Sequence, residues 1–125
     1  MALAFVVYAS LVGPRGLAAL QASLAEKART LASGLGAIDG LQSPRFDAPY
    51  LGEFTIELTH GRAGEFLDRL RRRKVLGGHS LADPRPGAAA TPERILVATT
   101  ESVGDREIQK YVRAARSAAI AGEGG

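Results

Sequence analysis

The chain has 125 residues and a formal net charge of +3, from 16 basic and 13 acidic side chains. This length fits one domain with a modest core, and a hydrophobic content of 46% excludes a compositionally disordered chain. The charge is too mild to indicate a nucleic-acid-binding protein by itself. The absence of cysteine excludes disulfides, thiolate metal sites and cysteine nucleophiles.

The chain starts with an apolar segment, Ala2 to Val12, in which Ser10 is the polar exception. A bilayer span needs about 20 apolar residues, so this segment is too short. A signal peptide carries cations before its apolar run, and only Met1 precedes this one. We therefore predict a helix that packs against protein on more than one side. A chain of this size offers little cover for it, which indicates that a packing partner is missing.

A glycine- and proline-containing break at residues 13–16 separates this segment from a second helix. Pro14 suits the first turn of the new helix. Apolar residues then recur at steps of three, four and seven, which predicts one face of a long amphipathic helix. That face comprises Leu17, Leu20, Leu24, Leu31, Leu35 and Ile38.

Residues 41–52 contain two prolines and predict a loop, and a strand with one buried face follows. In Glu53 to Thr59 the apolar residues alternate strictly with polar ones, so Phe54, Ile56 and Leu58 share a face. Helical spacing returns from about Gly61 to Arg73. The apolar stripe of this helix comprises Ala63, Phe66, Leu67 and Leu70.

Five cations lie in six residues at the end of this helix, from Arg69 to Lys74. They complement the negative end of the helix dipole, each by about 0.3–1 kcal/mol. The alternative interpretation is a nucleic-acid-binding patch, although aromatic residues are only 6% of the chain and stacking platforms are therefore scarce. The glycine pair Gly77-Gly78 predicts a turn into a short strand near His79 to Leu81.

The last third of the chain predicts a loop, a strand and a helix. Residues 82–92 form the loop, and the apolar run from Arg94 to Thr99 is typical of a central strand. Asp105 is the predicted N-cap of the final helix. The whole order predicts an α/β (α+β) fold, with a small, mainly antiparallel sheet of three or so strands and helices packed on one face.

The residues by themselves predict no catalytic group and no metal site. His79, Ser80 and Asp83 have the side chains of a catalytic triad, but a strand end and a polar turn explain them better. His60 and His79 lack the clustering that a metal needs. The glycines between Gly34 and Gly40 have the wrong spacing for a dinucleotide fingerprint. Solvated surface is the expected setting of Lys27, Lys74 and Lys110, and of the possible acid–base groups Glu53, Glu57 and Glu101.

Several motifs, in order over about residues 3–118, resemble one family. They are YASLVGPRGL from Tyr8, the Glu53-Phe54 strand start, VLGGHSL from Val75, and ILVATTE from Ile95. Together they resemble the C-terminal part of subunit 1 of the glycine cleavage system P-protein. That protein is glycine dehydrogenase (decarboxylating) in its two-subunit bacterial form. The basic run from Arg69 to Lys74 resembles the family's helix that precedes its Gly-Gly turn, so the resemblance favours the helix-dipole interpretation.

The resemblance implies a fold-type-I, aminotransferase-like architecture. Residues 1–13 would be a truncated interdomain helix, residues 14–120 the small C-terminal domain, and residues 121–125 a disordered tail. The large domain would lie upstream. Pyridoxal phosphate would be carried by P-protein subunit 2, so none is expected on this chain. The holoenzyme, in the cytoplasm, would decarboxylate glycine and pass the aminomethyl group to the lipoyl H-protein. Neither nucleic acid nor membrane is an expected partner.

This sequence departs from the family pattern at Gly52, Ser102 and Gly104. The resemblance implies Glu53, Thr100 and Glu101 as candidates for lining a site, with local backbone hydrogen bonding as the alternative. We therefore expect a fragment or split piece of the dehydrogenase, inactive alone. The alternative is a non-catalytic interaction or dimerisation module that uses the apolar first helix.

Overall fold

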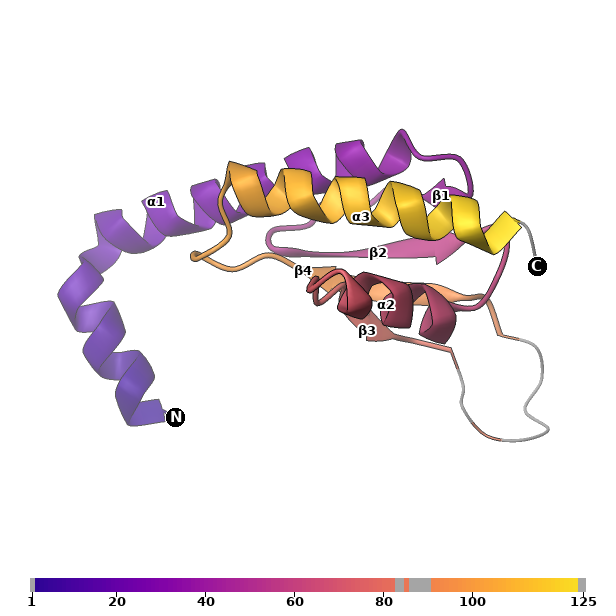
Figure 1. Cartoon of the computed structure of the whole chain (residues 1–125). Helices are drawn as coiled ribbons and strands as arrows, with labels where there is room; N and C mark the ends of the chain where they lie inside the picture. Colours follow the sequence, from indigo (N-terminus) through magenta and orange to yellow (C-terminus); the bar gives the residue numbers. More distant parts are fainter. Residues whose placement is uncertain (1, 83–84, 86–90, 124–125) are drawn as a thin grey trace.

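The computed structural model describes residues 2–82, 85 and 91–123, and it shows one layer of helices on one face of a small sheet (Figure 1). The elements are α1 (Ala2–Gly36), β1 (Leu41–Gln42), β2 (Glu53–Leu58), α2 (Ala63–Arg72), β3 (His79–Ser80), β4 (Arg94–Ala98) and α3 (Asp105–Glu123). The predicted α/β (α+β) fold class with a small antiparallel sheet is confirmed.

The sheet has four strands in the order β1-β2-β4-β3, and all neighbours are antiparallel. Phe54 pairs with Val97 and Ile56 with Ile95, so apolar side chains of β2 and β4 share the inner face. The prediction of three or so strands did not include β1, which lies where a loop was expected. Two residues are too few to show an alternating pattern, and Leu41 is fixed by pairing with Leu58.

A single core joins the inner face of the sheet to all three helices. The predicted stripe of α2 is buried except for Leu67, which is half-buried. The inner face of α3 is buried, while α1 is buried only from Ala25 onward. Leu17, Leu20 and Leu24 are half-buried, so the predicted face of α1 is only partly covered. The largest fully buried side chains are Phe66, Leu35, Ile56, Leu70, Ile95 and Val97.

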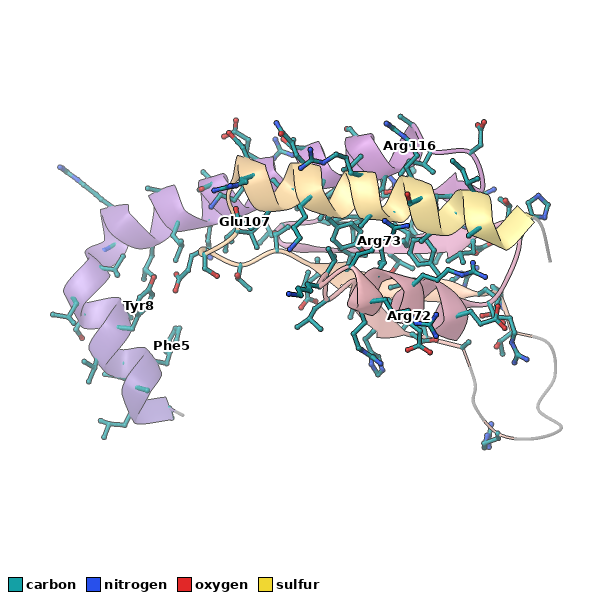
Figure 2. The ribbon with its side chains drawn as sticks, in the orientation of Figure 1. Phe5, Tyr8, Arg72, Arg73, Glu107 and Arg116 are labelled. Atoms are coloured by element: carbon teal, nitrogen blue, oxygen red, sulfur yellow. The ribbon has the colours of Figure 1, made fainter. Side chains whose placement is uncertain are left out.

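The first turns of α1, residues 2–12, form an arm that lies apart from the sheet and the other helices and is bent relative to the rest of α1 (Figure 1). The bend is at Gly13, whose backbone has φ 74° and ψ 173° and which precedes Pro14, as the sequence predicts. Apolar side chains cover the arm and are exposed, with Leu3 at 77%, Phe5 at 65% and Leu11 at 82% (Figure 2). The structure thus contains the uncovered apolar helix that the sequence predicts.

Counted as one helix, α1 is long and apolar enough to cross a membrane, with an 18-residue window of mean hydropathy 1.6 that is 0% buried. Length and composition alone do not distinguish such a helix from one that packs against protein. The helix bends at Gly13, so it is not one straight segment. The sequence-based expectation of no membrane partner stays a prediction.

Two element ends differ from the predictions. Asp105 is the first residue of α3 and not its N-cap, because Gly104 caps the helix with Glu107. The α3 helix continues to Glu123, so it enters the segment predicted as a disordered tail, where Ala121 favours helix. Residues 124 and 125 lie outside the described part of the chain. The division of the chain into domains stays a prediction.

Candidate functional site

The three candidate site residues lie at one end of the sheet but do not form one cluster. Glu53 starts β2 and pairs with Ala98, while Thr100 and Glu101 follow β4. All three are exposed. Within the described residues, no hydrogen bond or ion pair joins Glu53 to the other two. Thr100 Oγ1 is 2.9 Å from Ser102 Oγ, which is the local turn bonding that was the alternative interpretation.

Glu101 connects the arm to the body of the protein. The hydroxyl of Tyr8 donates to Glu101 Oε2 over 2.6 Å, and the ammonium of Lys27 donates to the Glu101 backbone oxygen over 3.2 Å. The hydrogen bond to Glu101, followed by partial burial and the negative charge of Glu101, raises the pKa of the Tyr8 phenol. Sequence reasoning missed both partners, since it placed Lys27 on solvated surface and gave Tyr8 no role.

We expect Tyr8→Phe to free the arm without unfolding the body. The substitution removes the side-chain hydrogen bond to Glu101 and keeps the ring. Backbone amides of residues 2–12 should therefore exchange hydrogen faster, while amides of β2 and β4 stay as protected as before. Glu101→Gln is the matched control, because an amide oxygen still accepts the bond, and it should change exchange less. Equal arm protection in wild type and Tyr8→Phe would show that this bond does not position the arm.

Thr99 is the one buried polar residue in the described core, and it closes this end of the sheet. Its hydroxyl donates to the Gly52 carbonyl over 3.1 Å, and its backbone N–H donates to the same oxygen over 2.8 Å. The hydroxyl also lies 3.4 Å from the Leu24 carbonyl of α1. Thr99 therefore fixes the loop before β2 against β4 and α1.

Beside Thr99 lies a pocket of about 210 Å³ among α1, α3, the end of β4 and the loop after α2. Leu31, Val103 and Ile108 supply apolar lining, and Lys74 and Lys110 line it as cations. Glu107 also lines it, but accepts hydrogen bonds from its own N–H and that of Gly104, which lowers its carboxyl pKa. Two of the charged side chains of the pocket, Glu107 and Lys110, bond to backbone groups, which indicates a structural role for them.

A buried hydrogen bond holds the wall of this pocket. The hydroxyl of Tyr111 donates to the Gly77 carbonyl, and burial raises the pKa of the Tyr111 phenol. Gly77 belongs to the predicted glycine turn, which is thereby tied to α3. The phenol stays protonated at ordinary pH and acts as a structural donor.

The triad and metal hypotheses gain no support from the geometry. His79 and Ser80 are consecutive residues of β3, so their side chains point to opposite faces of the sheet. Asp83 lies outside the described residues. Among residues 2–82, 85 and 91–123, no group of three or more histidine or acidic side chains could hold a metal ion.

The lysines do not fit a Schiff-base cofactor. An amine of that kind needs a shielded setting that lowers its pKa. Lys74 and Lys110 are exposed, and the Lys110 ammonium donates to the Lys74 carbonyl over 3.4 Å. The half-buried Lys27 donates to Glu101. No chemical step through pyridoxal phosphate is therefore assigned to residues of this chain.

Glu57, considered as an acid–base group from the sequence, is held in an ion-pair cluster on the outer face of the sheet. Its Oε2 accepts from Arg94 Nε over 2.7 Å and from Arg45 Nε over 2.9 Å. Both guanidinium groups also stack on the exposed ring of Phe46, 5.1 and 5.4 Å from its centroid. These bonds, first that from Arg94, lower the Glu57 carboxyl pKa. We therefore assign this ion-pair cluster a structural role and not an acid–base role.

We expect Glu57→Gln to reduce the acid sensitivity of folding. Because the folded-state pKa of Glu57 is depressed, its stabilisation is present above the unfolded pKa and is lost as pH falls through the folded pKa. The difference in urea midpoint between wild type and Glu57→Gln should therefore be largest near neutral pH and shrink below about pH 4.3. Glu53→Gln, at an exposed site without such partners, should show no such trend. A constant difference across pH would contradict the assignment.

The fold places the chain in a structural class of proteins. The chain is similar to the crystal structure of glycine decarboxylase (P-protein) of the glycine cleavage system in inhibitor-bound form, with a TM-score of 0.74 and 23% identity. The similarity covers 90% of this chain and 24% of that one, and at this identity it shows the fold alone. The aminotransferase-like fold of the P-protein, implied by the sequence motifs, is thereby confirmed.

The sequence comparisons are more specific. The chain is 33% identical over 114 residues to probable glycine dehydrogenase (decarboxylating) subunit 1 of Methylococcus capsulatus. It is 34% identical over 113 residues to the protein of the same name from Novosphingobium aromaticivorans. These matches cover 91% and 90% of this chain, but the chain spans only about a quarter (24%) of the length of either relative. No family model matches. The resemblance stated from the motifs is confirmed, and it is a resemblance to part of a larger protein.

Proposed function

We propose that the chain is a part of glycine dehydrogenase (decarboxylating) subunit 1 and contributes a small structural domain to that enzyme. The similarity to the named subunit over nine-tenths of the chain supports this proposal. The exposed apolar arm supports it independently, because an isolated domain rarely leaves such a helix uncovered. In the proposed assembly the arm packs against the remainder of the subunit.

The proposed activity belongs to the assembled enzyme and not to this chain alone. It decarboxylates glycine and passes the aminomethyl group to the lipoyl arm of the H-protein, in the cytoplasm. Pyridoxal phosphate, carried by P-protein subunit 2, supplies the electron sink for decarboxylation when bound. The residues of this chain build and position a domain next to that chemistry. The 125-residue chain alone is proposed to be inactive.

The size of the native product tests the assignment. An antibody raised against the chain should detect, in source cells, a band several times larger than the 13.1 kDa of this chain. That result would show that the chain is made as part of a longer subunit. A band at 13.1 kDa alone would contradict the proposal that the domain is made within a longer subunit.

A cofactor test addresses the chain directly. The chain is incubated with pyridoxal phosphate and treated with borohydride. We expect no stoichiometric, reducible absorbance band, because Lys74 and Lys110 are exposed and the half-buried Lys27 donates to the Glu101 backbone. Such a band would overturn the proposal that the cofactor belongs to the partner subunit.

The exposed arm also supports a second candidate function, a non-catalytic module that dimerises or docks through it. This candidate predicts that the chain self-associates in solution at micromolar concentration and that Leu3→Ser with Phe5→Ser abolishes the association. The matched control is Leu76→Ser, which changes an exposed apolar side chain away from the arm. A monomer at high concentration would exclude dimerisation.

A further inference from the structure

The outer surface of α2 and α3 carries a groove lined by arginines. Arg69, Arg72 and Arg73 of the α2 end form one side, and Ser117, Ala118 and Ala121 of α3 form the other. Figure 2 shows Arg72 and Arg73 beside α2 and Arg116 on α3. We call this feature the α2–α3 groove. Its small α3 residues leave room for a ligand to approach the backbone.

One wall of the groove is held in place. Arg69 Nη1 donates to the backbone oxygen of Ala118 over 3.1 Å, which ties α2 to α3. Glu65 lies 3.9 Å from Arg69, at the limit of an ion pair. Arg72 and Arg73 are exposed and have no ion pair with any described residue. Arg71, by contrast, is paired with Asp68 over 2.9 Å. The groove therefore presents guanidinium groups that are not neutralised within the described chain.

The positive surface continues along α3. Arg106, Lys110, Arg113 and Arg116 recur at steps of four and three, which places them toward one face of the helix, and all are exposed. Glu107 is the one acid between Arg106 and Arg116, and its carboxylate is bonded to the backbone N–H of Gly104. The exposed face of α3 is thus positively charged beside the groove, although Arg116 lies at the edge of α3 away from α2 (Figure 2) and does not line the groove.

The helix dipole does not account for this surface. Cations at the C-terminal end of α2 complement the dipole, as the sequence analysis proposes for Arg69 to Lys74. Arg106, however, lies in the first turn of α3, where the dipole favours acidic residues. Its position does not stabilise the helix. Lys110 lies beyond the first turn and donates to the Lys74 carbonyl, so a ligand outside the chain would give a role to Arg106 that the fold does not.

We propose that the α2–α3 groove binds an acidic segment of a partner protein. Guanidinium groups bind carboxylates through paired hydrogen bonds, and arginine is enriched in protein interfaces. Ile120, 65% exposed on α3, supplies an apolar contact on the same helix. A single-stranded nucleic acid would need exposed rings for stacking, but Phe66 and Tyr111, the aromatic residues of α2 and α3, are both buried.

This proposal does not depend on the proposed enzyme. It concerns the outer helix face and not the arm, so either inference can fail alone. Substitutions in the groove should leave the arm contact between Tyr8 and Glu101 unaffected, because the groove is built from α2 and α3 alone. Substitutions on the arm should likewise leave binding to the groove unchanged.

The test is a titration of the 125-residue chain with a labelled amphipathic peptide that carries glutamates and leucines on one helical face. We expect binding that weakens with salt and that falls by at least about tenfold in Arg72→Gln/Arg73→Gln. Arg113→Gln/Arg116→Gln, which changes exposed arginines of α3 outside the groove lining, should weaken it less. The control double variant, Arg15→Gln/Arg29→Gln, removes the same charge from exposed sites on α1 and should change the affinity by less than about twofold.

Helix content, measured by circular dichroism, separates lost binding from lost folding in each variant. Equal weakening by the groove and control variants would overturn the proposal, because it would show attraction by net charge alone. Absence of peptide binding would overturn it as well. Tighter binding of a random duplex DNA, or of vesicles of anionic lipid, than of the peptide would overturn the choice of a protein partner in favour of that polyanion.

Discussion

Gly78→Ala is expected to destabilise the fold by roughly 3 kcal/mol or more. Gly78 has a φ of 129°, a conformation that residues with a Cβ rarely adopt. An added Cβ would lie 2.2 Å from the Leu96 carbonyl oxygen and 3.1 Å from Ile95 Cγ2. The oxygen belongs to the backbone of β4, where Leu96 pairs with the next residue, His79, so it cannot move without breaking the β3–β4 pairing.

Urea unfolding followed by circular dichroism measures the effect. Gly61→Ala is the matched control, because Gly61 also has a positive φ, 79°, but an added Cβ would meet nothing within 4 Å. Gly61→Ala should be destabilised only by the cost of holding an alanine at positive φ, roughly 1–2 kcal/mol. The excess loss in Gly78→Ala then measures the clash with β4. Equal losses in the two variants would mean that the turn moves away from Leu96 at no cost.

The regular parts of this fold could be predicted from the sequence because their patterns are local. The alternation in Glu53 to Thr59 determines β2, and the three- and four-residue spacing around Phe66 determines α2. The strand β1 could not be predicted, since its two residues are defined by pairing with β2 and not by their own pattern. The cap of α3 was misassigned because Gly104 with Glu107 forms the cap without a polar N-cap side chain.

The contacts of the candidate site are a different case. Tyr8 and Glu101 are 93 positions apart, and nothing in a single sequence pairs them. The hydroxyl of Thr99 bonds to the carbonyls of Gly52 and Leu24, and backbone acceptors carry no sequence signal at all. The uncovered arm, in contrast, could be predicted, because a helix apolar on every side needs more surrounding protein than 125 residues supply.

Phe66→Ala is expected to cost about 3–5 kcal/mol, the usual range for emptying a fully buried aromatic position. Phe66 is 1% exposed, lies on α2 and belongs to the core that joins the sheet to the helices. The variant should shift the urea midpoint strongly or unfold at ordinary temperature. Phe66→Leu keeps most of the volume and should cost markedly less, which would attribute the loss to the cavity.

Phe5→Ala provides the opposite case, because its ring is 65% exposed on the arm. In the 125-residue chain it should change stability by less than about 0.5 kcal/mol. If the arm packs on the remainder of the proposed subunit, the same substitution in the longer protein should cost several-fold more, because the ring is then buried. A large loss in the 125-residue chain itself would mean that the arm packs on its own body, and the argument for a missing packing partner would fail. The difference between the two lengths of chain therefore measures how much of the arm's apolar surface is covered by the rest of the enzyme.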